Sequence, residues 1–182
     1  MATFDLLGIS GSLRKGSFNR KLIREAGRIG GATSFIEADL YLPLYDGDLE
    51  EAKGIPASVQ TLSDQIANAD AVVISTPEYN KGVSGVLKNA LDWVSRTEGT
   101  PWADKPVALM SATAGRAGGE RAQFDLRLDM VPFRARLIQG PEVLVGQCSA
   151  QFEENGQLKE GSYTDFMGKL MDALKAEVAL AR

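Results

Sequence analysis

A loop rich in glycine and hydroxyl residues, SGSLRKGSFNR at residues 10–20, follows the first apolar segment and opens a helical segment. The backbone N–H groups, the hydroxyls and the helix N-terminus of such a loop attract an anion. Its neutral hydrogen-bonding side chains are Ser10, Ser12, Ser17 and Asn19, and Arg14 adds a fixed positive charge. The loop predicts a cup for a single phosphate group, with an ordinary strand-to-helix turn as the alternative.

Two familiar phosphate-binding motifs do not match this loop. Gly11 and Gly16 have the spacing of the P-loop glycines, but Ser17 and Phe18 stand where lysine and a hydroxyl residue are required. The spacing of Gly8 from the two later glycines also differs from the G-x-G-x-x-G dinucleotide fingerprint.

A second unusual loop, TPEYNKGVSG at residues 76–85, follows the β-branched run AVVIST. Pro77 stiffens its start, Tyr79 offers a flat ring, and Asn80 with the nearby glycine permits tight backbone geometry. This combination suits a planar heterocycle, and a turn with a surface tyrosine is the alternative.

A third loop, SATAGRAGGER at residues 111–121, follows the fourth predicted strand. It again combines hydroxyl residues, glycines and a helix start, with Arg116 and Arg121 added. Three such loops converging on one edge are hard to explain as turns alone, so together they predict a ligand site.

The composition limits the chemistry of that site. The chain of 182 residues has no histidine, which excludes histidine bases and histidine-held metals. Its single cysteine, Cys148, cannot form an internal disulfide, a C-x-x-C pair or a cysteine-held cluster, and is interpreted as a small core residue. A bound cofactor or the carboxylates must therefore carry any difficult reaction. The net charge of −4 argues against a nucleic-acid partner.

The N-terminus, MATFDLLGIS, lacks the features of a signal peptide. The sequence contains no apolar run of the roughly 18 residues that a membrane span needs. With its single thiol, the chain is expected to be cytoplasmic and to have no membrane partner.

Alternating apolar runs and amphipathic stretches predict the elements that position the three loops. Strands are expected at residues 3–9, 33–40, 71–76, 105–112 and 137–145, and the strand pattern of the last segment is interrupted by Gly140 and Pro141. Helices are expected at residues 19–28, 55–68, 119–132 and 162–180, and another after the third strand. The inward stripe of that further helix is Val83, Val86, Leu87, Ala90, Leu91 and Val94, and Ser84 is its expected N-cap. Residues 46–54 and 147–161 are expected to be exposed loops.

Continuous apolar strands alternating with helices predict a parallel sheet covered on both faces. The expected architecture is an α/β, flavodoxin-like, doubly wound five-stranded parallel sheet with strand order 2-1-3-4-5, formed by one domain over residues 1–182. The order reverses between the first and third strands, so a ligand is expected at their carboxyl ends, where the first two loops lie.

The blocks GSLRKGSFNR, TPEYNKGVSGVLKNALDWVSR and AGRAGGERAQFDLR resemble the NAD(P)H-dependent FMN reductase family. The resemblance runs from Leu6 to about Pro141, and the last forty residues add little to it. These flavodoxin-like enzymes reduce quinones, chromate, ferric complexes and azo dyes. The resemblance implies bound FMN, NADH or NADPH as co-substrate, small electron acceptors, and self-association as a dimer or tetramer with the LKNALDW helix near the interface.

The resemblance also implies roles for individual residues. The FMN phosphate would lie on Ser12, Arg14, Ser17 and Asn19, with Pro77, Glu78, Tyr79 and Asn80 along the isoalloxazine and Thr113 and Gly115 on its other side. Lys81 replaces the aromatic residue often found after PEYN, which affects the acceptors that fit. The residues expected to contact the cofactor are Ser10, Ser12, Leu13, Arg14, Ser17, Phe18, Asn19, Pro77, Glu78, Tyr79, Asn80, Lys81, Ser111, Thr113 and Gly115.

The expected reaction passes a hydride from the nicotinamide to the flavin and then two electrons to an acceptor, without a catalytic side chain. One alternative is a flavodoxin-type electron carrier, which shares the fold but does not oxidise NAD(P)H. A second is a small phosphatase, but that chemistry needs a nucleophilic cysteine in the first loop, and Cys148 lies elsewhere.

Overall fold

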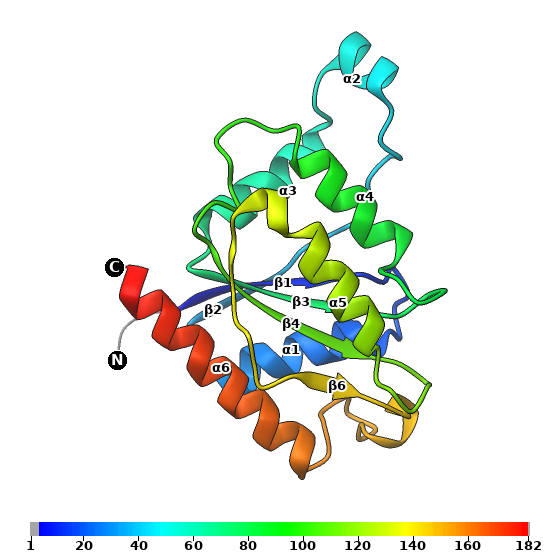
Figure 1. Cartoon of the computed structure of the whole chain (residues 1–182), viewed down its shortest axis with the longest axis vertical. Coiled ribbons are helices and arrows are strands. Elements are labelled where there is room, and N and C mark those ends of the chain that lie inside the picture. The colour runs from blue at the N-terminus through cyan, green and yellow to red at the C-terminus, as the bar shows by residue number, and fades with distance from the viewer. Residues whose placement is uncertain (1–3, 182) are drawn as a thin grey trace.

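The computed structural model describes residues 4–181. Its centre is a parallel sheet in the order β2-β1-β3-β4-β5, with β6 also paired to β4 (Figure 1). The strands are β1 (Asp5–Ser10), β2 (Ser34–Glu37), β3 (Ala71–Thr76), β4 (Pro106–Ala112), β5 (Arg136–Leu137) and β6 (Val143–Val145). The expected doubly wound topology with order 2-1-3-4-5 is therefore confirmed, with one additional strand.

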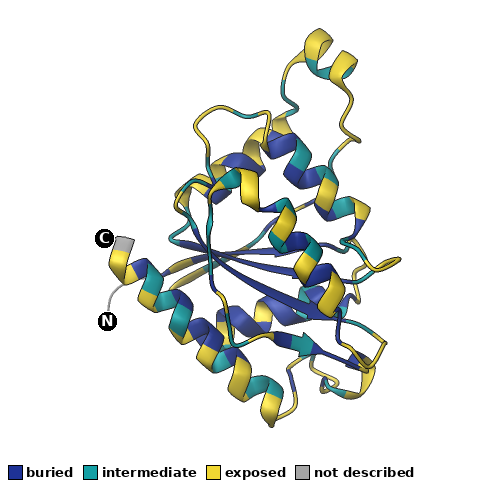
Figure 2. Cartoon of the chain, in the orientation of Figure 1, coloured by how far each residue is buried: buried dark blue, intermediate teal, exposed yellow. Residues whose placement is uncertain are grey.

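Strands β3 and β4 are buried along their whole length, which explains why their sequences are largely unbroken apolar runs. Successive residues of a strand face opposite sides of the sheet. Val73 and Met110 accordingly lie in one core cluster, whereas Val72 and Leu109 lie in the other. The sheet thus separates two apolar layers, seen as buried strands between half-buried helices in Figure 2.

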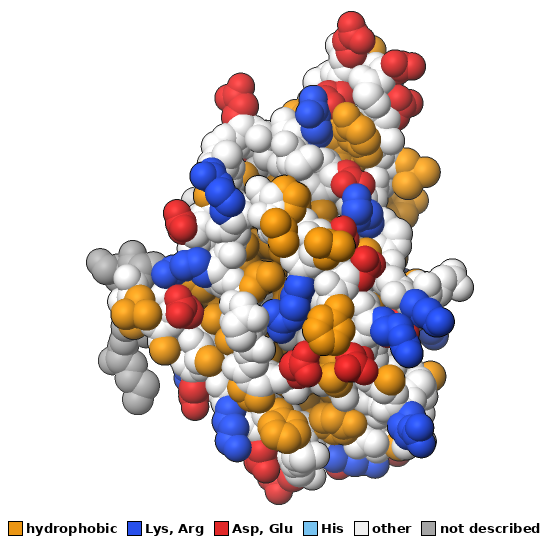
Figure 3. All heavy atoms as spheres, viewed as in Figure 1, with side chains coloured by type: hydrophobic (Ala, Val, Ile, Leu, Met, Phe, Trp, Pro, Cys, Tyr) orange, Lys and Arg blue, Asp and Glu red, His pale blue; other side chains and the backbone are white. Residues whose placement is uncertain are grey.

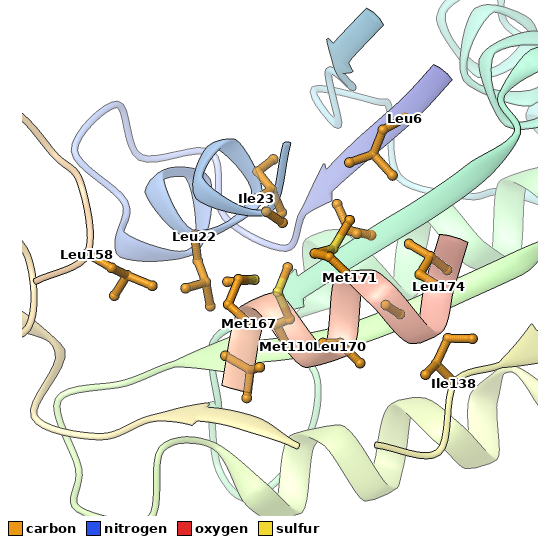
Figure 4. Close-up of a cluster of buried hydrophobic side chains, with 14 of the residues drawn as sticks. Leu6, Leu22, Ile23, Met110, Ile138, Leu158, Met167, Leu170, Met171 and Leu174 are labelled. Carbon is orange, nitrogen blue, oxygen red and sulfur yellow. The ribbon is translucent and has the colours of Figure 1, made fainter. Parts of the chain in front are cut away.

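Helices cover both faces of the sheet. On one face lie α1 (Phe18–Gly30) and α6 (Ser162–Ala181). Figure 4 shows α6 side chains such as Met167, Leu170 and Met171 packed against Leu22 and Ile23 of α1. On the other face lie α3 (Ala57–Asn68), α4 (Gly85–Val94) and α5 (Glu120–Asp129). The α1 and α6 contacts explain why the methionines of the last helix belong to the core.

Residues 46–54 were predicted to form an exposed loop; the segment is not buried, but the prediction of a loop is wrong. The segment contains the helix α2 (Gly47–Lys53), which stands away from the rest of the molecule (Figure 1). The Asp46 carboxylate accepts the Asp48 N–H at 3.0 Å as an N-cap. None of the α2 residues is buried, so the helix has no apolar stripe for a periodicity argument to detect.

Two other segments show more detail than the predictions gave. The fifth strand segment, expected at residues 137–145 with an interruption at Gly140 and Pro141, forms two short strands, β5 and β6, on either side of these residues, because proline has no N–H for the ladder. The segment 147–161 is not simply exposed. Its Phe152 and Leu158 pair through an isolated bridge and belong to the core cluster beside α1 and α6.

Among residues 4–181, none of the helices has the length and apolar character needed to cross a membrane. The described part of the chain also contains no cluster of three or more acidic or cysteine side chains that could hold a metal ion.

Candidate functional site

The three loops meet at the carboxyl ends of β1, β3 and β4, around a cavity of about 370 Å³. Ten of the predicted residues line this cavity, namely Ser12, Arg14, Ser17, Phe18, Asn19, Pro77, Glu78, Tyr79, Thr113 and Gly115. Five residues missed by the prediction also line it, namely Gly16, Ala112, Ala114, Cys148 and Ser149. The predicted residues Ser10, Leu13, Asn80, Lys81 and Ser111 do not line it.

The first loop exposes unpaired backbone donors. Its turn is closed by the Ser17 N–H, which donates to the Arg14 carbonyl at 3.1 Å. The Ser17 hydroxyl oxygen then accepts the Asn19 N–H at 3.2 Å and caps α1. Within residues 4–181, the backbone N–H groups of Ser12, Arg14, Gly16 and Phe18 have no hydrogen-bond partner. Residues that line the cavity thus offer donors to an anion, as the loop composition predicted.

Gly11 holds this loop against the second one. Its N–H donates to the Ser75 carbonyl at 2.8 Å, and its carbonyl accepts the Ser84 hydroxyl at 2.6 Å. A Cβ atom at Gly11 would lie 2.8 Å from the Ser84 Oγ, so a larger residue would force the loops apart. Ser84 also caps α4 by accepting the Leu87 N–H at 3.3 Å, which confirms it as the expected N-cap.

Asn19 ties the start of α1 to the ends of β3 and β4. Its side chain is 4 % exposed and donates from Nδ2 to the Ala112 carbonyl at 2.9 Å. Its Oδ1 accepts the Ala112 N–H at 2.9 Å and the Ser75 hydroxyl at 2.7 Å. The carboxamide oxygen and one amide hydrogen are therefore engaged with the protein. Asn19 lines the cavity mainly as the residue that holds the first loop in place.

The second loop contains a two-residue turn. Tyr79 and Gly82 exchange both backbone hydrogen bonds, each 3.1 Å long. Asn80 and Lys81 between them have φ values of 52° and 68°, which is the left-handed geometry of a type I′ turn. Asparagine favours this geometry and lysine does not. The two residues form an exposed tip beyond the cavity, and the half-exposed Tyr79 lies at its edge.

Carboxylates of the second loop and of α5 join the two elements. The Asp125 Oδ2 accepts the Val83 N–H at 2.9 Å, and the Glu78 Oε2 accepts the Ala122 N–H at 3.4 Å. Glu78 thereby places its charge near the first turn of α5, where the helix dipole favours it. The second loop is positioned from both sides, by Ser84 and by α5.

Ser111 supports the third loop from the buried end of β4. It is completely buried, and its hydroxyl donates to the Gly118 carbonyl at 2.6 Å while accepting the Gln123 Nε2 at 2.9 Å. It therefore supports the loop rather than lining the cavity. The nearby Thr113 carbonyl accepts the Cys148 N–H at 3.0 Å, which brings the segment after β6 to the cavity.

Cys148 contributes a buried thiol to the cavity wall. It is 5 % exposed, and burial raises the pKa of the thiol above its ordinary value. The thiol therefore stays protonated at neutral pH and is a poor nucleophile, which argues against the phosphatase alternative. Nothing in the local sequence around Cys148 indicated this location, because only the pairing of β6 with β4 brings it there.

A doubly wound parallel sheet with unpaired backbone donors at its topological switch point is typical of mononucleotide-binding proteins of the flavodoxin type. The NADPH-dependent FMN reductase family matches residues 4–150. The chain belongs to this family, which makes it a flavin-dependent oxidoreductase.

Individual relatives agree with this assignment. The chain is 39% identical over 179 residues to a NAD(P)H-dependent FMN reductase of Pseudomonas aeruginosa, covering 97% of this chain and 96% of the relative. It is 45% identical over 165 residues to a quinone reductase of Escherichia coli, covering 88% of each. Among solved structures, the flavoenzyme NAD(P)H:(acceptor) oxidoreductase FerB of Paracoccus denitrificans matches with a TM-score of 0.86, 30% identity and 98% coverage of both chains.

Proposed function

We propose that this protein binds FMN in the cavity between the three loops and uses it to pass two electrons from NADH or NADPH to quinones, with chromate and ferric complexes as further acceptors. The proposal is supported most directly by the first loop, where unpaired backbone donors and the positive charge of Arg14 gather at the switch point of the sheet.

The residues present fit such a cofactor. The Ser12 and Ser17 hydroxyls, the free N–H groups and Arg14 would hold its phosphate. Pro77 and Tyr79 would lie along its ring system, largely through backbone groups and the tyrosine face. Thr113 and Gly115 would close the opposite edge. The cavity volume of about 370 Å³ is within the range of small-molecule sites.

When bound, FMN supplies the hydride-accepting and electron-donating chemistry that the chain itself lacks. The protein positions the cofactor, directs N–H dipoles toward negative charge and leaves one side of the cavity open. Donor and acceptor would use that open side in turn, so we expect ping-pong kinetics with parallel double-reciprocal plots. Intersecting plots would argue for a complex that holds both substrates together.

The decisive experiment is to soak the purified protein in FMN, remove the excess and record a flavin absorption spectrum. Steady oxidation of NADPH with a quinone or ferricyanide then separates a reductase from an electron carrier. A protein that stays colourless would refute the cofactor site. A flavin-loaded protein that does not oxidise NADH or NADPH would support the carrier alternative. The cytoplasmic location expected from the sequence stays a prediction.

Replacing Arg14 with alanine is expected to weaken FMN binding. Loss of one charge-assisted hydrogen bond costs about 1.5 to 3 kcal/mol, or roughly a ten- to hundred-fold rise in Kd. Quenching of FMN fluorescence measures this Kd. The matched control is Lys53→Ala on the distant helix α2, which removes the same charge and is expected to change Kd less than about two-fold. If the two variants bind FMN with equal affinity, Arg14 does not contact the phosphate of the cofactor.

We also propose that the chain self-associates through the face that carries α4 and α5. Phe124, Leu128 and Val131 expose 57%, 70% and 68% of their surface there, and Figure 3 shows hydrophobic side chains gathered on this face. A groove of about 450 Å³ lined in part by Leu91 and Trp102 lies alongside. This location agrees with the interface that the resemblance implies for the α4 helix.

The self-association is tested by the Leu128→Glu variant. Light scattering after size exclusion is expected to show a dimer or tetramer for the wild type and a smaller species for this variant. The Leu180→Glu control changes a similarly exposed leucine on α6 and is expected to assemble like the wild type. A monomeric wild type would refute the proposal.

A further inference from the structure

A second cavity lies on the other side of the first loop. It has a volume of about 460 Å³ and opens at the carboxyl ends of β1 and β2. Its lining residues are Ser10, Ser12, Leu13, Lys15, Arg20, Glu37, Ala38, Asp39, Leu40 and Tyr41. Ser12 lines both cavities, so the first loop is the wall between them. A ligand that crosses the loop at Ser12 would reach from one cavity into the other.

Ser10 is a buried polar residue of this cavity whose hydroxyl the protein leaves unpaired. It is 5 % exposed, and its Oγ has no hydrogen-bond partner in residues 4–181. Strand alternation places Ser10 on the same face of β1 as Leu6 and Gly8, toward the start of α1 and away from the Leu7 and Ile9 cluster. An unpaired buried hydroxyl costs about 1 to 3 kcal/mol, so its presence at a cavity points to a ligand group that completes it.

The charges around this cavity favour an anion. Arg20 and Arg24 both pair with the Glu37 carboxylate, which leaves an excess positive charge at that cluster. Lys15 is exposed at the rim and forms no salt bridge within the described residues. The lining itself carries two cations, Lys15 and Arg20, and two carboxylates, Glu37 and Asp39, and Arg20 is paired with Glu37. Lys15 is therefore the group that offers a positive charge to an anion at this edge.

Two further side chains suit the other parts of a nucleotide. Tyr41 is 80% exposed and offers a flat face at the mouth of the cavity. Such a ring stacks readily on a purine base. Asp39 follows the end of β2, with one oxygen accepting the Tyr41 N–H at 2.9 Å. The carboxylate oxygens of Asp39 accept hydrogen bonds, which suits them to the hydroxyls of a ribose.

We propose that this second cavity binds the adenosine phosphate end of NADH or NADPH. In this arrangement Lys15 and Arg20 face phosphate, Asp39 and the Ser10 hydroxyl face the ribose, and Tyr41 stacks on the adenine. The pyrophosphate crosses the first loop at Ser12, which directs the nicotinamide toward the open side of the first cavity. The assignment rests on the proposed function, because it names where that same reaction holds its electron donor.

The kinetic test uses Lys15→Ala and Tyr41→Ala, each with a matched control. The controls are Lys53→Ala, which removes an exposed lysine from α2, and Leu44→Ala, which removes an exposed apolar side chain from the same segment as Tyr41. The two test variants are expected to raise the KM for NAD(P)H about five-fold or more, as loss of one polar or stacking contact predicts. The KM for the quinone and the Kd for FMN are expected to change less than about two-fold. Unchanged KM values for NAD(P)H would overturn the proposal.

A binding test keeps this proposal separable from the FMN proposal. Calorimetry with 5′-AMP and with adenosine 2′,5′-bisphosphate is expected to show binding to the wild type and about five-fold weaker binding to both test variants. Both nucleotides are expected to inhibit competitively against NAD(P)H. Tighter binding of the bisphosphate would assign the site to NADPH. Absence of binding, equal binding by the variants or inhibition that is not competitive would refute the site. If the protein binds no FMN, the calorimetry still tests this cavity.

Discussion

The Asn19→Leu variant is expected to lose about 3 to 5 kcal/mol of unfolding free energy, since each buried polar group left unpaired costs about 1 to 3 kcal/mol. The substitution leaves three groups without a hydrogen-bond partner, namely the Ala112 N–H, the Ala112 carbonyl and the Ser75 hydroxyl, which all bond the Asn19 side chain. These groups are buried at the ends of β3 and β4, where leucine offers no partner. Urea unfolding is the appropriate measurement, with the midpoint lowered and the slope unchanged.

Asn68→Leu is the matched control for this substitution. Asn68 is an exposed residue at the end of α3, where a surface change is expected to alter stability by less than about 0.5 kcal/mol. The Asn19→Leu variant should also bind FMN more weakly at temperatures where it remains folded, because its first loop has lost its anchor. If the two variants have the same unfolding midpoint, the hydrogen bonds of Asn19 make no net contribution to the free energy of unfolding.

The Gly118→Ala variant is expected to be destabilised by about 3 kcal/mol, combining a left-handed residue at about 1 to 2 kcal/mol with overpacking at about 1 to 3 kcal/mol. Gly118 has a φ of 66°, and a Cβ atom there would lie 2.4 Å from the Leu144 carbonyl oxygen. That oxygen belongs to β6, so it has little freedom to move. The third loop must shift instead, which disturbs the hydrogen bond between the Gly118 carbonyl and the Ser111 hydroxyl.

Gly31→Ala isolates the contribution of the clash. Gly31 has nearly the same φ, 64°, but a Cβ atom at this position would have nothing within 4 Å of it. The variant is expected to lose only about 1 kcal/mol, so the difference between the two variants measures the overlap with Leu144. Thermal or urea unfolding reports both values. Equal destabilisation would mean that the third loop adjusts freely and is not held against β6.

The strands and helices with strong apolar patterns were predictable. The third strand was predicted at residues 71–76 and is observed as Ala71–Thr76, because a β-branched run buried on both faces leaves a clear pattern. The closing helix, expected at residues 162–180, is observed as Ser162–Ala181. Helix α2 was missed for the opposite reason. With no buried residue, its sequence resembles that of a polar loop.

Not all of the residues predicted for the site line the cavity that the three loops form. Ser10 and Ser111 lie in loops or strand ends of the predicted composition, yet one faces a different cavity and the other supports the third loop from below. Asn80 and Lys81 were expected beside the ligand but form the tip of a tight turn. Side-chain direction at the end of a strand depends on the last few dihedral angles, and composition does not specify them.

The amino-acid sequence by itself determined the parallel doubly wound sheet, the edge at which a ligand is expected, the absence of histidine chemistry and the family. The sheet, the ligand edge and the lack of histidine follow from local periodicity and residue type, which act over a few neighbouring positions, whereas the family follows from the resemblance of three sequence blocks. Only the tertiary structure decided that Asn19 bonds Ala112, which is 93 residues away, and that Cys148 lines the cavity. Such contacts depend on the register of β1, β3, β4 and β6, and register is a property of the packed sheet that no single segment contains.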